Sequence, residues 1–234
     1  MYTLTAFALA VIPSLFLVRY FYRQDNLKPE PKKLIIKIFC IGILATFPVI
    51  IIELSIALFE DFFSFHPLAG PAFRAFVIAA LTEEFMKFIV VKYFVYNQAA
   101  FDEIMDGVVY TVVASLGFAC MENIIYVLQG GFTVAIIRAL TAVPLHAFAS
   151  GMMGYFIGKA KFASTKSEEK GLFIEGLAYA ILIHGLYDFF LFTVPELGNW
   201  VGFLILPLLY FSFRVLKKKI SQAKAEDTSE NHLN

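Results

Sequence analysis

The stretch IMDGVVYTVVASLGFACMENIIYVL (residues 104–128) determines the fold class, because it is an apolar segment long enough to cross a lipid bilayer. A membrane-spanning helix needs about 20 mostly apolar residues. Only Asp106 and Glu122 carry charge in this stretch. The sequence therefore predicts a transmembrane helix here, and similar stretches recur on both sides of it.

The composition of the whole chain agrees with a membrane location. Of 234 residues, 59% are hydrophobic and 16% are charged, against about 25% charged in soluble domains. The mean hydropathy is +0.74, which excludes an ordinary soluble enzyme. Nineteen basic and nineteen acidic residues balance, so no concentrated basic surface indicates a nucleic-acid partner. Cys40 and Cys120 lie in apolar runs and provide neither a disulfide framework nor a zinc-ribbon spacing.

Polar and proline-containing breaks divide the chain into about seven apolar spans. We predict an all-α fold, a polytopic membrane helix bundle with a single helical domain over residues 1–220. Residues 221–234 are polar and mixed in charge, so we expect a flexible cytoplasmic tail. The predicted spans are 1–22, 34–59, 71–96, 104–128, 133–158, 171–193 and 198–216.

The orientation follows from the basic residues, because Lys and Arg concentrate in cytoplasmic loops. The basic residues gather in alternate connections, whereas the connections around 60–70, 129–133 and 193–199 contain none. This pattern predicts an N-terminus outside and a C-terminus in the cytoplasm. The basic residues on the predicted cytoplasmic side are Arg19, Arg23, Lys28, Lys32, Lys33, Lys37, Lys92, Lys159, Lys161, Lys166, Lys170, Arg214, Lys217, Lys218, Lys219 and Lys224.

Charged and histidine side chains inside the spans are the main source of functional information. An ionised side chain at bilayer depth costs several kcal/mol, so such residues usually face the bundle interior and mark a functional pathway. The third to sixth spans hold most of them, which places any chemistry there. The inventory comprises Glu53, Glu83, Glu84, Lys87, Asp106, Glu122, Arg138, His146, Glu175, His184 and Asp188.

The segment TEEFMK (residues 82–87) places two adjacent carboxylates and an ammonium in the middle of a span. On an α-helix Lys87 lies four residues after Glu83 and three after Glu84, so it can reach either one. Consecutive residues project about 100° apart, so the glutamates cannot point equally at one atom. We expect one glutamate to act on water or metal, while Lys87 or a neighbouring helix holds the other. The alternative is a buried ion-paired triad that only fixes helix packing.

Two histidines, His146 and His184, lie in the fifth and sixth predicted spans. Neutral imidazole is the commonest metal ligand and a frequent general base. Asp188 follows His184 by four residues on the same helix face, so it either joins the site or orients the ring. With a rise of 1.5 Å per residue, these groups lie in the central to outer part of the bilayer. The spacing predicts a site open toward the external leaflet.

Taken in order, the polar motifs resemble those of the PrsW family of bacterial intramembrane endopeptidases, relatives of the type II CAAX-prenyl proteases. They occupy four successive spans over about residues 80–190, and the ordered set is more specific than any one motif. The motifs are Glu83-Glu84-x-x-Lys87, Phe118-x-x-x-Glu122-Asn123, His146 and His184-x-x-x-Asp188.

The resemblance implies a multi-pass protease of the bacterial cell membrane. Its substrate would be a single-pass anti-sigma factor, and its first cut would lead to release of the sigma factor. The resemblance also implies that Glu83, Glu84 and His184 are catalytic, with Lys87 in support. The chain differs from the CAAX relatives at two positions, because Glu122 stands where they place a histidine and Asp188 where they often have asparagine.

Several hypotheses remain open at this level. In a metal-dependent hydrolase, zinc would be held by Glu122, His146 and His184, with Asp188 and Asn123 orienting the ligands from outside. In a metal-free hydrolase, one buried glutamate would serve as general base. A proton- or ion-coupled transporter is the alternative from another class, although no paired repeat halves are evident. A non-catalytic membrane scaffold is the third.

Overall fold

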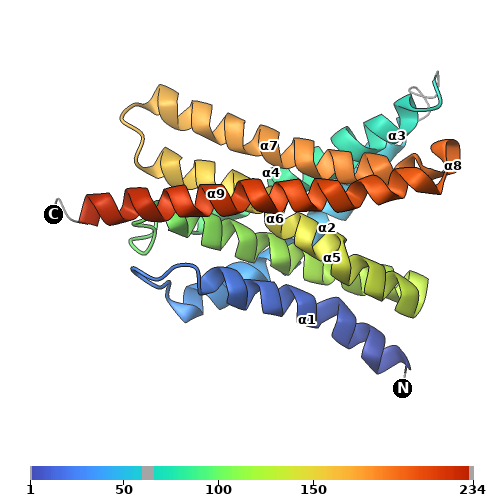
Figure 1. Ribbon diagram of the computed structural model, residues 1–234, viewed down its shortest axis with the longest axis horizontal. Coiled ribbons are helices and arrows are strands. Elements are labelled where there is room, and N and C mark those ends of the chain that lie inside the picture. The colour runs from blue at the N-terminus through green and yellow to red at the C-terminus, as the bar shows by residue number, and fades with distance from the viewer. Residues whose placement is uncertain (1, 60–65, 232–234) are drawn as a thin grey trace.

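The computed structural model describes residues 2–59 and 66–231, and this part of the chain is helical without any strand (Figure 1). The predicted all-α fold class is therefore confirmed. The elements are α1 (Tyr2–Tyr22), α2 (Lys32–Ala57), α3 (Ala69–Phe73), the π-helix η2 (Arg74–Leu81), α4 (Thr82–Phe94), α5 (Ile104–Leu140), α6 (Ala142–Lys161), α7 (Lys166–Phe192), α8 (Val194–Leu197), the 3-10 helix η3 (Asn199–Leu204) and α9 (Ile205–Asn231).

The centre of the bundle is an antiparallel hairpin formed by α5 and α6. The chain reverses at Gly131, whose φ of 68° suits a residue without a Cβ. Residues at about the same distance from this glycine meet across the hairpin: Ser115 Oγ donates to the carbonyl oxygen of His146 at 2.9 Å. At Gly154 a Cβ would lie 2.8 Å from the Cα of Val108. The two arms are therefore in close contact, as small residues allow in membrane helix pairs.

Within residues 2–59 and 66–231, five stretches are long and apolar enough to cross a membrane, compared with seven predicted spans. One of the five, Ile104–Lys161, covers the fourth and fifth predicted spans. Its reversal at Gly131 falls within the predicted connection at 129–133 and separates it into two antiparallel arms. The predicted span 71–96 is not one of the five stretches. It is divided among α3, η2 and α4 and carries several charges. The count of seven and the orientation stay predictions.

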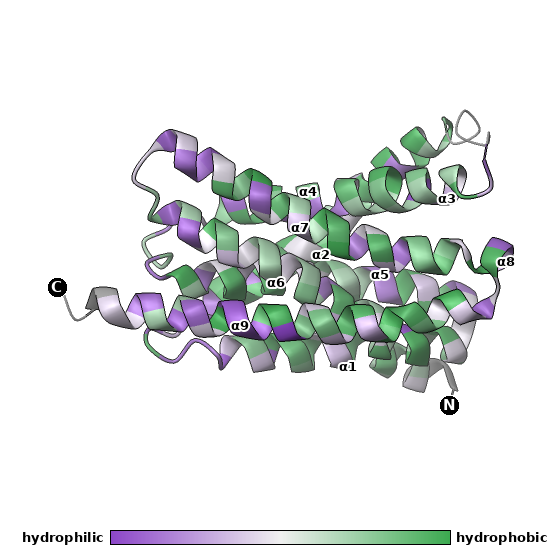
Figure 2. Ribbon diagram, turned by 45° about the horizontal axis from the view of Figure 1, so that its top comes forward, coloured by the Kyte–Doolittle hydropathy of each residue, from purple (hydrophilic) through white to green (hydrophobic). Residues whose placement is uncertain are grey.

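Connections that we predicted to be cytoplasmic lie together at one end of the bundle. Lys161 Nζ donates to the carbonyl oxygen of Tyr96 at 2.7 Å, and Lys224 Nζ donates to Gln24 at 3.1 Å. The first contact joins the ends of α4 and α6, and the second joins α9 to the end of α1. Hydrophilic residues colour the same end, at the left of Figure 2. The predicted connection beginning at residue 60 lies partly outside the described residues.

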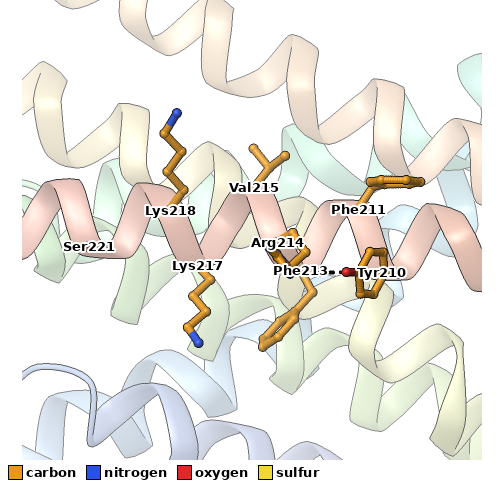
Figure 3. A pocket seen from close by; sticks show the side chains of 8 residues that line it. All are labelled: Tyr210, Phe211, Phe213, Arg214, Val215, Lys217, Lys218 and Ser221. Atoms are coloured by element: carbon orange, nitrogen blue, oxygen red, sulfur yellow. Dashed lines mark hydrogen bonds between the residues drawn. The ribbon is translucent and has the colours of Figure 1, made fainter.

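Helix α9 presents a surface hollow of about 950 Å³ in which aromatic and basic residues follow one another along the chain (Figure 3). Tyr210 and Phe211 come first, and Lys217 and Lys218 follow about two turns later, pointing to opposite sides of the helix. Aromatic residues followed by cations are typical of the zone where a helix leaves the bilayer. This order agrees with an exit from the membrane near residue 216.

The segment beyond residue 220 differs from the predicted flexible tail, because α9 continues to Asn231. Ala223 is fully buried and Asp227 is 3% exposed. Both oxygens of Asp227 accept hydrogen bonds from the first backbone N–H groups of α5, on Ile104 and Met105, at 2.7 and 3.0 Å. Composition alone predicted a solvated tail, and this long-range contact gives the segment a structural role.

Candidate active site

The acidic centre lies where η2 passes into α4. A π-helix is rare and often occurs at a functional site, because it changes the direction of the following side chains. Glu83 and Glu84 occupy the first turn of α4. They face His146 on α6 and His184 on α7, and these two rings meet edge to face with centroids 5.0 Å apart. Three helices that are distant in sequence therefore contribute to one buried site.

Lys87 connects the two glutamates to α6. Its Nζ lies 3.0 Å from Glu83 Oε2 and 2.7 Å from Glu84 Oε1, so it contacts both carboxylates rather than one. It also lies 3.0 Å from Nδ1 of His146 and 4.7 Å from the ring centroid of Phe118. Lys87 is 1% exposed. A buried ammonium requires this degree of pairing, since an isolated charge there would be costly.

Glu84 is fully buried and held on every side. One of its oxygens, Oε1, faces Lys87 at 2.7 Å and Nδ1 of His184 at 2.9 Å. The other, Oε2, accepts a hydrogen bond from Ser150 Oγ at 2.7 Å. A carboxylate with this many donors is fixed in position. Glu84 therefore connects α4 to both α6 and α7.

Glu83 is in a different environment. Its Oε2 accepts from Lys87 at 3.0 Å and lies 3.9 Å from Nδ1 of His146 and 4.0 Å from Nε2 of His184. These two distances exceed hydrogen-bond length, so neither ring is bonded directly to this carboxylate. We expected Lys87 or a neighbouring helix to hold one glutamate and leave the other free. Instead Lys87 contacts both, and Glu84 has more hydrogen-bond partners than Glu83.

The hydrogen bonds of His146 determine its tautomer. The Lys87 ammonium has donors only, so Nδ1 of His146 is an acceptor. The other ring nitrogen, Nε2, lies 2.9 Å from Glu122 Oε2 and donates to it. His146 is therefore a neutral imidazole with its proton on Nε2.

The surroundings of His184 favour a different protonation state. Nδ1 faces Glu84 at 2.9 Å, and Nε2 lies 3.3 Å from Asp188 Oδ2. The contact between His184 and Asp188 is the one that their spacing of four residues predicts. Ionised carboxylates only accept hydrogen bonds, so this pair of neighbours suits an imidazolium.

Glu122 belongs to the edge of the site nearest the α5–α6 reversal. Besides His146, its Oε2 lies 3.0 Å from a terminal nitrogen of Arg138. Nε of the same arginine donates to Asn123 Oδ1 at 2.7 Å, so Asn123 contacts Arg138 rather than a histidine. The Arg138 guanidinium also lies 4.0 Å from the ring centroid of Tyr126. Arg138 thus holds Glu122, which in turn holds His146.

The donors around the centre fit a zinc ion in type and spacing. Ligand atoms of Glu83, Glu84, His146 and His184 can be chosen within 4.8 Å of one another, and all four residues are buried. Carboxylate oxygen and imidazole nitrogen are common zinc ligands. The predicted set of Glu122, His146 and His184 is brought together in part, because Glu122 lies beyond this group, between His146 and Arg138. Lys87 already contacts one oxygen of each central carboxylate.

Two contributors were not among the predicted site residues. Arg138 appeared in the inventory of charged residues, but its role depends on the fold of the α5–α6 hairpin. Ser150 was not singled out, although it follows His146 by four residues on α6 and so shares its face. That spacing in an apolar helix is the signal that could have identified it.

Buried carboxylates and imidazoles in a bundle of membrane-length helices are the groups that a membrane-embedded hydrolytic enzyme requires. Comparison with known sequences agrees: a sequence model of the PrsW family of intramembrane metalloproteases matches residues 30–216. The chain belongs to this family, and it is a multi-pass bacterial membrane protease. This membership favours the protease hypothesis over the transporter and the scaffold.

Individual relatives cover nearly the whole chain. Protease PrsW of Geobacillus kaustophilus is 39% identical over 214 residues, which are 92% of this chain and 90% of the relative. Protease PrsW of Bacillus subtilis is 33% identical over 215 residues, covering 92% and 94%. Protease PrsW of Clostridioides difficile is 32% identical over 192 residues, covering 80% and 79%. No solved structure matches the chain significantly.

Proposed function

We propose that this protein makes the first cut in a single-pass anti-sigma factor, which leads to release of the sigma factor after further proteolysis. Membership of the PrsW family supports cleavage of a membrane protein. The identity of the substrate rests on the resemblance of the four motifs to those of the family. The transmembrane helix of such a substrate must open locally, because a helical peptide bond is protected from attack by its own hydrogen bonds.

Of the two glutamates, Glu83 is the better candidate for the general base of peptide hydrolysis. The observation that carries this assignment is the difference between the glutamates: Glu84 is held by Lys87, Ser150 and His184, whereas Oε2 of Glu83 is bonded to Lys87 and lies about 4 Å from both imidazoles. Glu83 would take a proton from water as the oxygen attacks the carbonyl carbon. It would return this proton to the leaving nitrogen when the C–N bond breaks.

The other groups would support this reaction. An imidazolium at His184 can donate a hydrogen bond to the negative oxygen that develops on the attacked carbonyl. In the alternative, metal-dependent form, Glu84 and neutral His146 and His184 would hold zinc, which when bound would polarise the carbonyl and acidify water in place of the imidazolium, with Glu83 still the base. Lys87 would keep the carboxylates ionised and in place.

The proposed orientation puts the N-terminus outside and the C-terminus in the cytoplasm. His146 lies midway between the reversal at Gly131 and the end of α6 at Lys161. At 1.5 Å per residue this is about 22 Å from either point, near the middle of the bilayer. Glu122 is closer to the reversal, so substrate would enter from the outer leaflet.

The proposal is tested by comparing membrane-protein fragments in cells that carry the wild type, Glu83→Gln or the double variant Glu83→Gln, Glu84→Gln, matched for expression. Glu175→Gln is the control, because Glu175 is an exposed acid on α7. A single-pass anti-sigma factor should accumulate uncut in both site variants and be cut normally in the control.

The site variants must be folded for the comparison to count. Glu83→Gln leaves the pairs of Lys87 with Glu84 and of Glu84 with Ser150 in place, so its unfolding midpoint in detergent should stay near that of the wild type. Unchanged fragments under envelope stress with a folded Glu83→Gln protein would contradict the proposed function. Accumulation of a different single-pass protein would contradict the substrate and keep the protease.

A further inference from the structure

Five carboxylates converge at the end of the bundle away from the α5–α6 reversal. They come from the connection between α1 and α2, the start of α5 and the last turns of α9, which lie together at the left of Figure 1. Each is at most 3% exposed. The proposed hydrolytic mechanism uses none of them. They are Asp25, Glu30, Glu103, Asp106 and Asp227.

Helix capping accounts for part of this cluster. Asp106 Oδ2 accepts hydrogen bonds from the backbone N–H groups of Asp102 and Glu103, both at 2.7 Å. Asp227 accepts from the next two N–H groups, as described above. The first N–H groups of a helix lack partners within the helix and attract negative charge. Glu103 completes the capping, because its side chain accepts from the backbone N–H of Asp106. Three of the five carboxylates therefore have a structural explanation at the start of α5.

Asp25 and Glu30 have no such explanation. Neither carboxylate oxygen of Asp25 has a hydrogen-bond partner among the described residues, although the side chain is 3% exposed. Glu30 is 2% exposed; its Oε2 accepts from the hydroxyl of Tyr110, while Oε1 has no partner in the described part of the chain. A buried polar group without a partner costs free energy, and a buried charge costs more.

Two lysines lie near these carboxylates. Lys224 lines the same cavity and donates to Gln24 at 3.1 Å, whereas Lys28 pairs with the half-exposed Asp102 at 3.2 Å. Burial and the neighbouring Glu103 carboxylate raise the pKa of Asp25 to about 6, against an opposing effect of the backbone amides of Lys28 and Glu30. Burial likewise raises the pKa of Glu30 to about 7. Lys224 therefore shares the cavity with Asp25 while its ammonium is bonded to Gln24, and both oxygens of Asp25 are without a hydrogen-bond partner among the described residues.

A cavity and a ligand geometry offer a place for a cation beside Asp25. Oxygen atoms of Asp25, Glu103 and Asp106 can be chosen within 4.8 Å of one another. Beside them is a cavity of about 210 Å³, lined by Gln24, Asp25, Asn26, Leu27, Glu103, Met105, Lys224, Asp227 and Thr228. We infer that Asp25, Glu103 and Asp106 bind one hard divalent cation, Mg²⁺ or Ca²⁺, at a site separate from the hydrolytic centre.

The donor chemistry selects this class of ion. All three ligand residues offer carboxylate oxygen, which suits Mg²⁺ and Ca²⁺, whereas zinc and copper favour imidazole or thiolate. The bound cation joins two segments that are far apart in sequence, the α1–α2 connection and the start of α5. It would stabilise the packing of α1 on the central hairpin, beside the contact that Asp227 already makes between α9 and the start of α5.

The test is a titration of the purified full chain with Mn²⁺, a paramagnetic substitute for Mg²⁺ and Ca²⁺ whose free concentration is read by electron paramagnetic resonance. We expect the wild type to bind one Mn²⁺ at this site, displaced by Mg²⁺ or Ca²⁺. Asp25→Asn should weaken this binding at least tenfold, because it removes a ligand charge and breaks no hydrogen bond. Asp102→Asn, a neighbouring exposed acid, should change it less than twofold.

A separate variant tests whether the Mn²⁺ binds at the hydrolytic centre instead. His184→Ala removes a ligand there, and it should leave the Mn²⁺ titration at the carboxylate site unchanged. Mg²⁺ or Ca²⁺ should also raise the unfolding midpoint of the wild type and not that of Asp25→Asn. The inference is overturned if the wild type binds no Mn²⁺ here, or if Asp25→Asn binds it equally well. It is also overturned if the wild-type midpoint responds only to acid and ignores divalent cations.

Discussion

The ammonium of Lys87 lies 3.0 Å from Nδ1 of His146 and donates to it. This contact has two consequences for the site. It fixes His146 as the neutral tautomer that donates from Nε2 to Glu122, and it connects the charge of α4 to the hairpin of α5 and α6. Lys87 thus sets the protonation of a histidine as well as balancing two carboxylates.

The first prediction concerns the removal of Lys87. Lys87→Met should abolish substrate cleavage and lower stability, because it leaves Glu83 and Glu84 buried without their cation. Breaking a buried ion pair from one side costs about 3–5 kcal/mol. For a chain of this size that corresponds to a fall of roughly 10 °C in the unfolding midpoint, measured in detergent by a thermal scan.

A compensating variant separates charge from shape in the same experiment. Adding Glu83→Gln and Glu84→Gln to Lys87→Met removes the uncompensated charges, so the midpoint should recover in part while cleavage stays absent. If Lys87→Met alone is as stable as the wild type, the ion pairs described here do not hold the helices together.

The second prediction separates the two glutamates. Glu83→Gln should lower cleavage about 10²–10⁴-fold, the usual contribution of a general base, with little change in the unfolding midpoint. Glu84→Gln should lower both, since Glu84 contacts Lys87, Ser150 and His184. Fragment yield in matched cells and thermal scans of the purified proteins give the two readouts. Equal effects of both variants on both readouts would argue against the assignment of Glu83 as base.

Much of this architecture could be predicted from sequence because membrane helices are constrained so strongly. Apolar length indicated the helices, and spacing of three or four residues indicated that Lys87 can reach either Glu83 or Glu84 and that Asp188 shares a helix face with His184. Simultaneous contact of Lys87 with both glutamates was not expected. These are local relationships on a single helix, where geometry is fixed by the backbone.

The sequence did not predict which side chains contact one another between helices. The neighbours of Glu122 depend on how α5 folds back at Gly131, which brings Arg138 beside a residue 16 positions earlier. Ser150 could have been suspected from its spacing, but its contact with Glu84 depends on the packing of α6 against α4. The helical tail was missed for the same reason, because the long-range contacts of Asp227 explain its order and its composition does not.

The third prediction concerns zinc. If the Glu/His centre is a metal site, purified wild-type protein should contain one zinc per chain by elemental analysis, and His184→Ala should lose it. Glu175→Gln, which changes an exposed acid of the same helix, should retain zinc. A fully active preparation without metal would instead establish the metal-free form, in which Glu83 activates water unaided.

The fourth prediction assigns a positioning role to Arg138. Its Nε donates to Asn123 while a terminal nitrogen faces Glu122, so two partners are engaged by one planar group. Lysine has a single charged nitrogen and cannot reproduce this fork. Arg138→Lys should therefore keep the fold but lower cleavage about 10–100-fold, the usual loss when a residue supporting a ligand is changed. Arg214→Lys is the control, because Arg214 bonds only to the exposed Tyr210 among the interactions seen on α9.

A positioning role and a merely structural one give different outcomes for Arg138. If Arg138 acts through Glu122 and His146, the nitrogen NMR shifts of the His146 ring should change in Arg138→Lys, because its hydrogen bond from Nε2 to Glu122 is no longer held in place. The unfolding midpoint should fall only slightly, since a cation still lies near Glu122. A large loss of stability with an unchanged His146 ring would show instead that Arg138 only joins the two arms of the hairpin.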